Sequence, residues 1–540
     1  MRLSILLALS LAIAPLACAW NPPNGSRQES HNSVTISGYT YGSALPVTIK
    51  VKNWNTNAVS SVGSTTSGTS ELFLGSNLYP WSVTVPSSMF DKANWTPSNL
   101  GPSTSASTWI PSAQLSLMAF QGTTQLYTFS AAAQKCTLDK MNAGVSQLQA
   151  GRECTDGQAI TLYDPSGYGV SPPALAWNVV SSKDMYVGAA LVRVELFTYE
   201  SGGNTVWGMA CRPSGAGLST AHRTMVYDHG GAEGLDEVSA WMCTDFAAHG
   251  WSVAMSAYRG ERMYVNPSWG MTGIPASYWD PAHANCLRPF NPNAVETSLG
   301  EVMDVHRLLE GLASRPWANT GKLFLWGHSH GGAITLRALQ TGAQVRAAAL
   351  RAPAWSWSDI YNDCATPSWP NGVVPGILCP VLVANMPTAF AGTPATNARS
   401  YEWRSPSFFV NDLKTRSEVT LYVQHGILDD TVQVGQSCNL VKETWGTTFD
   451  KVWHAPDDPT NTSAVATPID DCGLTFQPAP RPSYSALVGP IRYQEKGRYL
   501  VVYDNLNHVF TRPWALLDPN TSANRDFALY VEWLAATWGA

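Results

Sequence analysis

The 540-residue sequence predicts an α/β fold with a mostly parallel sheet and helices on both faces, preceded by a β-rich N-terminal domain. After about residue 205, continuously apolar runs alternate with helix-like stretches, as is typical of parallel sheets that are covered on both faces. Residues 20–130 are instead rich in Ser, Thr, Asn and Gly, with short alternating runs that indicate strands bounded by turns. Because the chain is too long for one ordinary domain, we expect two, at 20–190 and 191–540.

Residues 1–19 are expected to form a signal peptide. Arg2 precedes an apolar stretch, and residues 17–19, ACA, fit a small-residue cleavage site. Export removes Cys18 and leaves nine of the ten cysteines in an oxidising compartment, where disulfides persist. Plausible bridges between nearby cysteines are Cys136–Cys154, Cys364–Cys379 and Cys438–Cys472. We therefore expect a secreted protein, or a periplasmic one if the source is bacterial. In a eukaryote, glycosylation motifs would begin at Asn24, Asn94, Asn461 and Asn520.

The charge balance argues against several kinds of partner. Charged residues make up 13% of the chain, and the net charge of −6 comes without a basic cluster. Nucleic acids and anionic membrane surfaces are therefore not expected to bind. No apolar stretch after the signal peptide approaches the roughly 20 residues that span a bilayer, so no membrane anchor is expected. The cysteine spacing is not that of a zinc site, and we predict neither a metal nor a cofactor.

The second domain is expected to begin with two strands within residues 190–213, joined at a Gly-Gly turn. Further strands are expected at 223–231, 251–260, 321–327, 345–353, 418–426 and 498–505, and helices at 237–250, 299–314 and 331–340. Residues 354–400 and 443–495 do not fit this alternation, and we interpret both as insertions. The first is rich in Trp and Pro and is a candidate lid or substrate wall.

The motif Gly327-His328-Ser329-His330-Gly331 lies between an expected strand and an expected helix. In a G-x-S-x-G turn, small residues let the chain bend sharply, which exposes the serine hydroxyl beside a helix N-terminus that favours negative charge. No other stretch of the chain matches this pattern, so Ser329 is the candidate nucleophile. The side chains of His328 and His330 are expected to point elsewhere, as those of turn residues. The backbone N–H of His330 is a candidate donor to the oxyanion.

The general base and its acid can be sought from chain order, which in this architecture is serine, acid, histidine. Only His454 and His508 lie downstream of a suitable acid. His454 lies in an irregular stretch, whereas His508 follows the last expected strand, so we predict His508. Asp429 and Asp430 follow the preceding strand, and one carboxylate there can hold the tautomer of the base. We choose Asp429, with Asp430 as the fallback, and expect His425 to be a structural turn residue.

The stretch YDHGGAEG at 227–234 is expected to supply the second oxyanion donor. Glycines after the earlier strand allow a backbone N–H to approach the reacting carbonyl. Gly231 is the candidate, and Ala232 is a close rival.

Several of these stretches together resemble the catalytic domain of the prolyl-oligopeptidase family of α/β-hydrolases. They are VYDHGG (226–231), YRGE (258–261), GEVMDVHRLLEGL (300–312), GHSHGG (327–332), YEWRSPSFFVNDL (401–413) and HGILDDTV (425–432). The resemblance covers about residues 205–510 and implies an α/β-hydrolase fold and serine hydrolysis. The family's serine, aspartate and histidine map onto Ser329, Asp429 and His508. Family members that cleave peptides usually carry a propeller before this domain, and none is apparent in 20–190.

The sequence therefore predicts a secreted serine hydrolase that cleaves a carboxylic ester through an acyl-enzyme intermediate. A peptidase of the prolyl-oligopeptidase type is the first alternative. The resemblance supports serine hydrolysis more firmly than it supports cleavage of either an ester bond or a peptide bond. An inactive secreted binding protein on a hydrolase scaffold is the second. For an enzyme, the expected partner is a small-molecule ester or a peptide.

Overall fold

The computed structural model divides into two compact units, Met1–Ser105 with Trp109–Ser171, and Ala106–Thr108 with Pro172–Ala540. The residues that it describes are 19–21, 34–41, 46–53, 59–66, 68–73, 76–85, 115–121, 124–125, 177–201, 204–214, 221–231, 234–292, 295, 297–367, 369, 373–390, 392–396, 401–402, 404–414, 416–445, 451–455, 474, 477–478, 493–504, 506–508 and 522–538. Residues 1–18 of the expected signal peptide, Cys136, Cys154, Cys472 and the four candidate glycosylation sites lie outside these ranges.

The first unit contains two four-stranded antiparallel sheets among its described residues. One has the order β1 (Ala19–Asn21), β2 (Val34–Tyr41), β6 (Ser76–Val85) and β5 (Glu71–Phe73), and the other β4 (Val59–Thr66), β3 (Pro46–Asn53), β7 (Leu115–Gln121) and β8 (Thr124–Gln125). Trp81 and Val83 are buried two positions apart on β6, as expected for one face of a strand. The prediction that the N-terminal region contains β-structure is confirmed.

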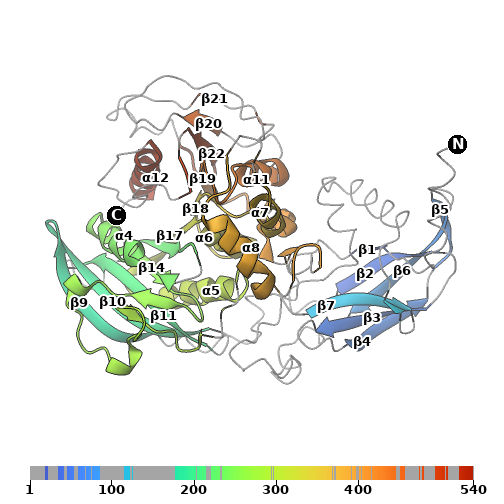
Figure 1. Cartoon of the computed structure of the whole chain (residues 1–540), viewed down its shortest axis with the longest axis horizontal. Coiled ribbons are helices and arrows are strands. Elements are labelled where there is room, and N and C mark those ends of the chain that lie inside the picture. The colour runs from blue at the N-terminus through green and yellow to red at the C-terminus, as the bar shows by residue number, and fades with distance from the viewer. Residues whose placement is uncertain are drawn as a thin grey trace. The chain divides into compact units, whose positions relative to one another are not determined.

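An eleven-stranded sheet lies at the centre of the second unit (Figure 1). Its order is β21 (Gln477–Pro478), β20 (Lys451–Ala455), β22 (Arg498–Tyr503), β19 (Thr420–Gly426), β18 (Ala347–Arg351), β17 (Ala318–His328), β12 (His222–Asp228), β14 (Ser252–Ser256), β11 (Asn204–Pro213), β10 (Ala190–Ser201) and β9 (Asn178–Val187). The strands from β21 to β14 are parallel, and β11, β10 and β9 continue the sheet antiparallel. Every residue of β14, β18 and β19 is buried, because both faces of the sheet are covered.

Helices cover both faces of this sheet (Figure 1). α4 (Glu237–Ala248) and α12 (Ser522–Trp538) share one buried apolar cluster with Phe324 and Trp326 of β17. α5 (Gly300–Ala313), α6 (His330–Gln340) and α11 (Gly435–Trp445) lie on the opposite face. α10 (Val410–Lys414) packs against α6 and α11. The short elements are β13 (Gly234–Leu235), β15 (Arg262–Tyr264) and β16 (Cys286–Leu287), which form a small sheet, and the 3₁₀ helices η5 (Pro267–Trp269), η6 (Ala276–Tyr278) and η8 (Pro406–Phe409). The predicted α/β architecture is confirmed. Among the described residues, no helix has the length and apolar character needed to cross a bilayer.

Two helices, α7 (Trp357–Cys364) and α8 (Leu378–Ala389), occupy the first expected insertion, and we call them the cap. The disulfide Cys364–Cys379 closes the cap, as the cysteine spacing predicted. A second disulfide, Cys211–Cys243, joins β11 to α4. It was not anticipated, because the two cysteines are 32 residues apart and meet only when α4 packs on the sheet.

Three expectations differ from the structure. Residues 443–495 are not wholly an insertion, because β20 and β21 extend the parallel sheet beyond β22. His454 therefore lies within β20, paired with Val502 of β22, and not in an irregular stretch. The continuous part of the second unit starts at Pro172, earlier than the expected residue 191, because β9 pairs with β10 in the large sheet. β9 is an edge strand and β20 lies next to the edge strand β21, and both were missed because they lack the continuously apolar sequence of a central strand.

Candidate active site

Ser329 lies in the sharp turn between β17 and α6, with φ 56° and ψ −121°. Only a few per cent of residues other than glycine have a positive φ, and such strained backbone is typical of functional sites. Backbone hydrogen bonds hold the turn. The Ser329 N–H donates to the carbonyl of Arg351 at 2.9 Å, and the Ser329 carbonyl accepts from several N–H groups, with that of Gly332 at 2.9 Å. The hydroxyl is thus presented at the N-terminus of α6.

The two glycines of the motif are required by close packing. A Cβ on Gly331 would overlap the carbonyl oxygen of Asp228 at the end of β12, and a Cβ on Gly327 would overlap the Thr335 hydroxyl. Any side chain at either position would therefore push α6 away from the sheet and move Ser329.

His508 connects Ser329 to Asp429 through two hydrogen bonds. Its Nε2 lies 2.8 Å from the Ser329 Oγ, and its Nδ1 lies 2.9 Å from Oδ2 of Asp429. With Nδ1–H donating to the carboxylate, Nε2 is free to accept the serine proton. The structure thus brings together the three predicted residues, and it places Asp429 rather than Asp430 against the imidazole.

The Asp429 carboxylate is buried and fully surrounded by donors. Its Oδ1 accepts the backbone N–H groups of Thr431 at 3.0 Å and Val432 at 2.8 Å, and the Nε2 of His425 lies 3.3 Å from Oδ2. Burial alone would raise the pKa of Asp429, but His508 and then His425 outweigh it and hold that pKa well below its usual range. The sequence indicated only a structural turn for His425. The structure places its buried ring at the end of β19, against the candidate acid.

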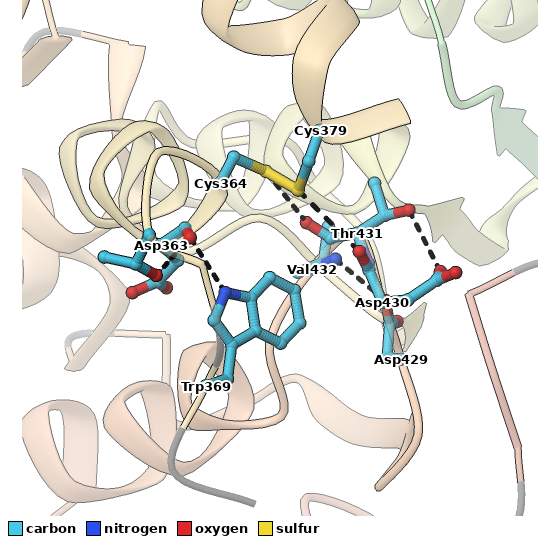
Figure 2. Close-up of a disulfide and its surroundings, with 9 residues drawn as sticks. Asp363, Cys364, Trp369, Cys379, Asp429, Asp430, Thr431 and Val432 are labelled. Carbon is cyan, nitrogen blue, oxygen red and sulfur yellow. Dashed lines mark hydrogen bonds between the residues drawn. A yellow bond between two sulfur atoms is a disulfide. The ribbon is translucent and has the colours of Figure 1, made fainter. Parts of the chain in front are cut away.

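The loop that carries Asp429 is attached to the cap (Figure 2). The Sγ atoms of the Cys364–Cys379 disulfide lie 3.8 Å and 3.7 Å from the carbonyl oxygens of Thr431 and Asp430, respectively. The Gly376 N–H also donates to the Asp430 carbonyl, at 2.7 Å. The cap therefore packs directly on residues 430–431, which follow the candidate acid.

The candidate donors to a developing oxyanion are the backbone N–H groups of His330 and Gly231. His330 is the first residue of α6, so its N–H has no acceptor within the helix. Gly231 has φ +74°, a conformation that glycine adopts readily. Apart from its chain neighbours, no atom of the described residues lies within 4 Å of a Cβ built on it. The backbone around Gly231 is thus open on the side where a side chain would stand. The rival donor, Ala232, lies outside the described residues.

The side chains of His328 and His330 make contacts that the sequence did not predict. His328 donates from Nε2 to the carbonyl of His508 at 3.2 Å, and His330 donates from Nδ1 to the carbonyl of Gly231 at 2.8 Å. Burial, with smaller effects of His508 and Arg351, lowers the pKa of His328 to about 3, so this imidazole is neutral. Both partners come from distant segments, so no local pattern could have revealed these contacts.

The described residues contain no group of three or more His, Cys, Asp or Glu side chains arranged to hold a metal ion. The hydrogen-bonded chain from Ser329 to Asp429 is an arrangement suited to nucleophilic acyl transfer. It lies at the carboxyl ends of the parallel strands β17, β19 and β22, where open α/β sheets bind ligands.

Comparison with solved structures finds several hydrolases of low identity. Pyrococcus horikoshii acylaminoacyl peptidase is 14% identical, with 71% of this chain and 45% of that chain covered and a TM-score of 0.38. Acetyl xylan esterase from Paenibacillus sp. R4 is 14% identical, with coverages of 63% and 84% and a TM-score of 0.36. A puromycin hydrolase is 13% identical, with coverages of 68% and 46% and a TM-score of 0.39. This chain spans less than half the length of the two acylaminoacyl peptidase structures that it matches.

No curated protein sequence matches the chain. Residues 238–529, more than half of the chain, match the family described as "Alpha/beta hydrolase family". The matched segment contains the Ser329 turn, Asp429, His508 and most of the parallel sheet. The chain therefore belongs to the alpha/beta hydrolase family.

Proposed function

We propose that the protein is a secreted serine hydrolase that cleaves a carboxylic ester through an acyl-enzyme intermediate. The observation that carries this proposal is the hydrogen-bonded chain from the Ser329 hydroxyl through His508 to the buried Asp429. The strained serine turn at the start of α6 adds support, because it exposes the hydroxyl beside a helix N-terminus.

In the proposed reaction each residue has its own role. Ser329 attacks the ester carbonyl while His508 Nε2 accepts its proton, and Asp429 stabilises the imidazolium that forms. The N–H groups of His330 and Gly231 bind the oxyanion of the tetrahedral intermediate. His508 then returns the proton to the departing alcohol, and a water molecule repeats the sequence to release the acid and restore Ser329. The protein needs no metal or cofactor for these steps.

An ester is favoured over a peptide because of the N-terminal unit. Residues 20–190 show no sign in their sequence of the propeller that usually precedes peptide-cleaving members of the prolyl-oligopeptidase family. A peptidase of that family remains the alternative, supported by the sequence motifs around Ser329 and Asp429.

The test is a panel of nitrophenyl esters and peptide nitroanilides offered to the purified protein and to Ser329→Ala. We expect ester turnover by the wild type, complete labelling of Ser329 by a fluorophosphonate, and loss of both in the variant. Turnover of anilides alone would identify a peptidase instead. A wild type that is neither active nor labelled would identify an inactive binding protein on the same scaffold.

We also propose that the protein acts outside the cytoplasm on small-molecule substrates, without a nucleic-acid partner or membrane anchor. The disulfides Cys211–Cys243 and Cys364–Cys379, both within the described residues, support an oxidising compartment. N-terminal sequencing of protein recovered from the culture medium, or from the periplasm of a bacterial source, tests this proposal. The expected mature protein begins at Trp20.

A further inference from the structure

Two imidazoles hold the peptide groups on either side of Gly231. His330 donates from Nδ1 to the Gly231 carbonyl at 2.8 Å, and the Nδ1 of His229 lies 3.1 Å from the Gly230 carbonyl. The His229 ring is itself stacked on Tyr258, with 4.1 Å between the ring centroids. Each of the two carbonyls that flank this glycine therefore has a fixed donor.

The His330 ring is anchored by a buried carboxylate on α5. Its Nε2 lies 2.9 Å from Oε2 of Glu301 and 3.0 Å from the Ser298 hydroxyl. Glu301 is fully buried, and its Oε2 also accepts the Ser298 N–H at 2.6 Å. Burial alone would lower the pKa of His330, but the charge and hydrogen bond of Glu301 raise it above the ordinary value. A carbonyl oxygen and a carboxylate oxygen are acceptors, so Nδ1 is placed to donate to Gly231 and Nε2 to Glu301.

Gly231 needs such a constraint if its N–H is to serve as a donor. Its φ of +74° lies in a region where glycine has wide conformational freedom, and it has no side chain that could fix the backbone by packing. In a trans peptide the N–H points opposite to the preceding C=O, so a hydrogen bond to Gly230 sets the direction of the Gly231 N–H. The hydrogen bond from His330 sets the following peptide group.

We propose that His330, held by Glu301, is a positioning residue that anchors Gly231 through its carbonyl, while His229 sets the direction of the Gly231 N–H, so that this N–H faces the substrate oxyanion. This inference rests on the proposed serine hydrolase function. His330 would then serve the oxyanion twice, through its own backbone N–H and through the side chain that fixes the second donor. Because its Nε2 is engaged by Glu301, the ring takes no part in proton transfer from Ser329. The two N–H donors are thereby held in fixed positions before the reaction begins, and they can stabilise the negative charge that develops in the transition state.

The experiment compares His330→Leu, His330→Asn and Glu301→Gln with the wild type. Leucine keeps the backbone N–H and removes the donor to Gly231, whereas the Asn side-chain amide can replace the Nδ1–H. We expect His330→Leu to lower kcat by about 10- to 100-fold, as for a misplaced catalytic group, with KM unchanged. Its affinity for phenylboronic acid, which forms a tetrahedral adduct on the serine, should fall in proportion to kcat. His330→Asn should recover part of kcat and part of the boronate affinity. Glu301→Gln should have values of both that lie between those of His330→Leu and the wild type.

A matched control is His306→Leu, because His306 is also a buried histidine and its Nε2 lies 2.7 Å from the Thr341 hydroxyl. It should reduce the thermal midpoint without changing kcat or boronate affinity. The inference is overturned if His330→Leu keeps the kcat and boronate affinity of an active wild type, or if Asn and Leu behave alike. If His330→Leu does not fold, the test rests on His330→Asn and Glu301→Gln. The inference is then overturned if both of these variants bind the boronate as tightly as the wild type does. If the wild type is inactive and is not labelled by a fluorophosphonate, the proposed function itself is wrong, and this inference is wrong with it.

Discussion

The Nε2 atom of His508 lies 2.8 Å from the Ser329 Oγ, although 179 positions separate the two residues in the sequence. Parallel strands explain this contact. Ser329 directly follows β17, His508 follows β22 after a short loop, and Asp429 follows β19, so all three lie at the same edge of the sheet. Side chains at the carboxyl ends of parallel strands are held by rigid elements, which keeps reacting atoms within hydrogen-bond distance.

The adjacent carboxylates Asp429 and Asp430 offer a matched pair for testing the acid. Asp429→Asn should lower kcat by about 10⁴-fold, because an amide can stabilise the wrong tautomer of His508. Asp430→Asn should leave kcat near the wild-type value, because the Asp430 carboxylate accepts from the Thr431 hydroxyl at 3.3 Å and does not contact the imidazole. Steady-state kinetics of the two variants on the same ester decides the assignment. Equal losses in both would contradict it.

His328 is expected to support the base indirectly. Its Nε2–H donates to the His508 carbonyl, and the two rings stack with 5.1 Å between their centroids. His328→Phe should keep the stacking and lose the hydrogen bond, so we expect about a tenfold fall in kcat from a less well held base, with KM unchanged. His328→Gln places an amide donor near the position of Nε2 and should restore part of the loss. Similar kcat values for Phe, Gln and the wild type would show that the hydrogen bond has no role.

The central part of the fold could be predicted from the sequence because its signals are local. β18 and β19 are buried along their whole length, and most of their residues are apolar. The Gly327 to Gly331 turn has a fixed pattern. Chain order then selected Asp429 and His508, because strand ends bring them to one edge. These predictions needed only burial and connectivity.

The parts that the sequence did not reveal depend on contacts between distant segments. β20 lies near the edge of the sheet and lacks a long apolar run, so its sequence did not identify it as a strand. The ion pair of His330 with Glu301 joins two helices, and His425 reaches Asp429 only through the turn after β19. A histidine beside a serine looks the same in sequence whether its ring is exposed or, as here, hydrogen-bonded to a loop 99 residues away.

The cap disulfide is expected to stabilise the acid loop. The double variant Cys364→Ser/Cys379→Ser removes a crosslink over 15 residues, which corresponds to about 3 kcal/mol of unfolding free energy in the chain-entropy account. Because its sulfur atoms contact the carbonyls of Thr431 and Asp430, we expect kcat/KM to fall together with the thermal midpoint. The matched control is Cys211→Ser/Cys243→Ser, which frees β11 from α4 and should lower the midpoint alone. If kcat/KM falls equally in both pairs, the effect is one of general stability.

The buried Asp228 at the end of β12 predicts a pH-dependent difference in stability. Its Oδ2 accepts from the Thr335 hydroxyl at 2.5 Å, while within the described structure its Oδ1 is buried without a hydrogen-bond partner. Burial raises the pKa of Asp228 to about 8, so the folded state binds a proton that the unfolded chain releases near its ordinary pKa of about 4. The contribution of Asp228 to stability therefore falls as pH rises from about 4 to about 8, and is constant above that range.

Asp228→Asn cannot ionise and can still accept from Thr335 through its amide oxygen. Relative to the wild type, its thermal midpoint should therefore rise as the pH increases from 5 to 9. Over this range only the wild type must either keep a proton on Asp228 or bury a carboxylate that has a single hydrogen-bond donor. Calorimetry of both proteins at pH 5, 7 and 9 measures this difference, and Thr335→Val should increase the wild-type dependence by removing the remaining donor to the carboxylate. A difference in midpoint that stays constant across this range would show that Asp228 keeps the same protonation state in the folded and unfolded chain.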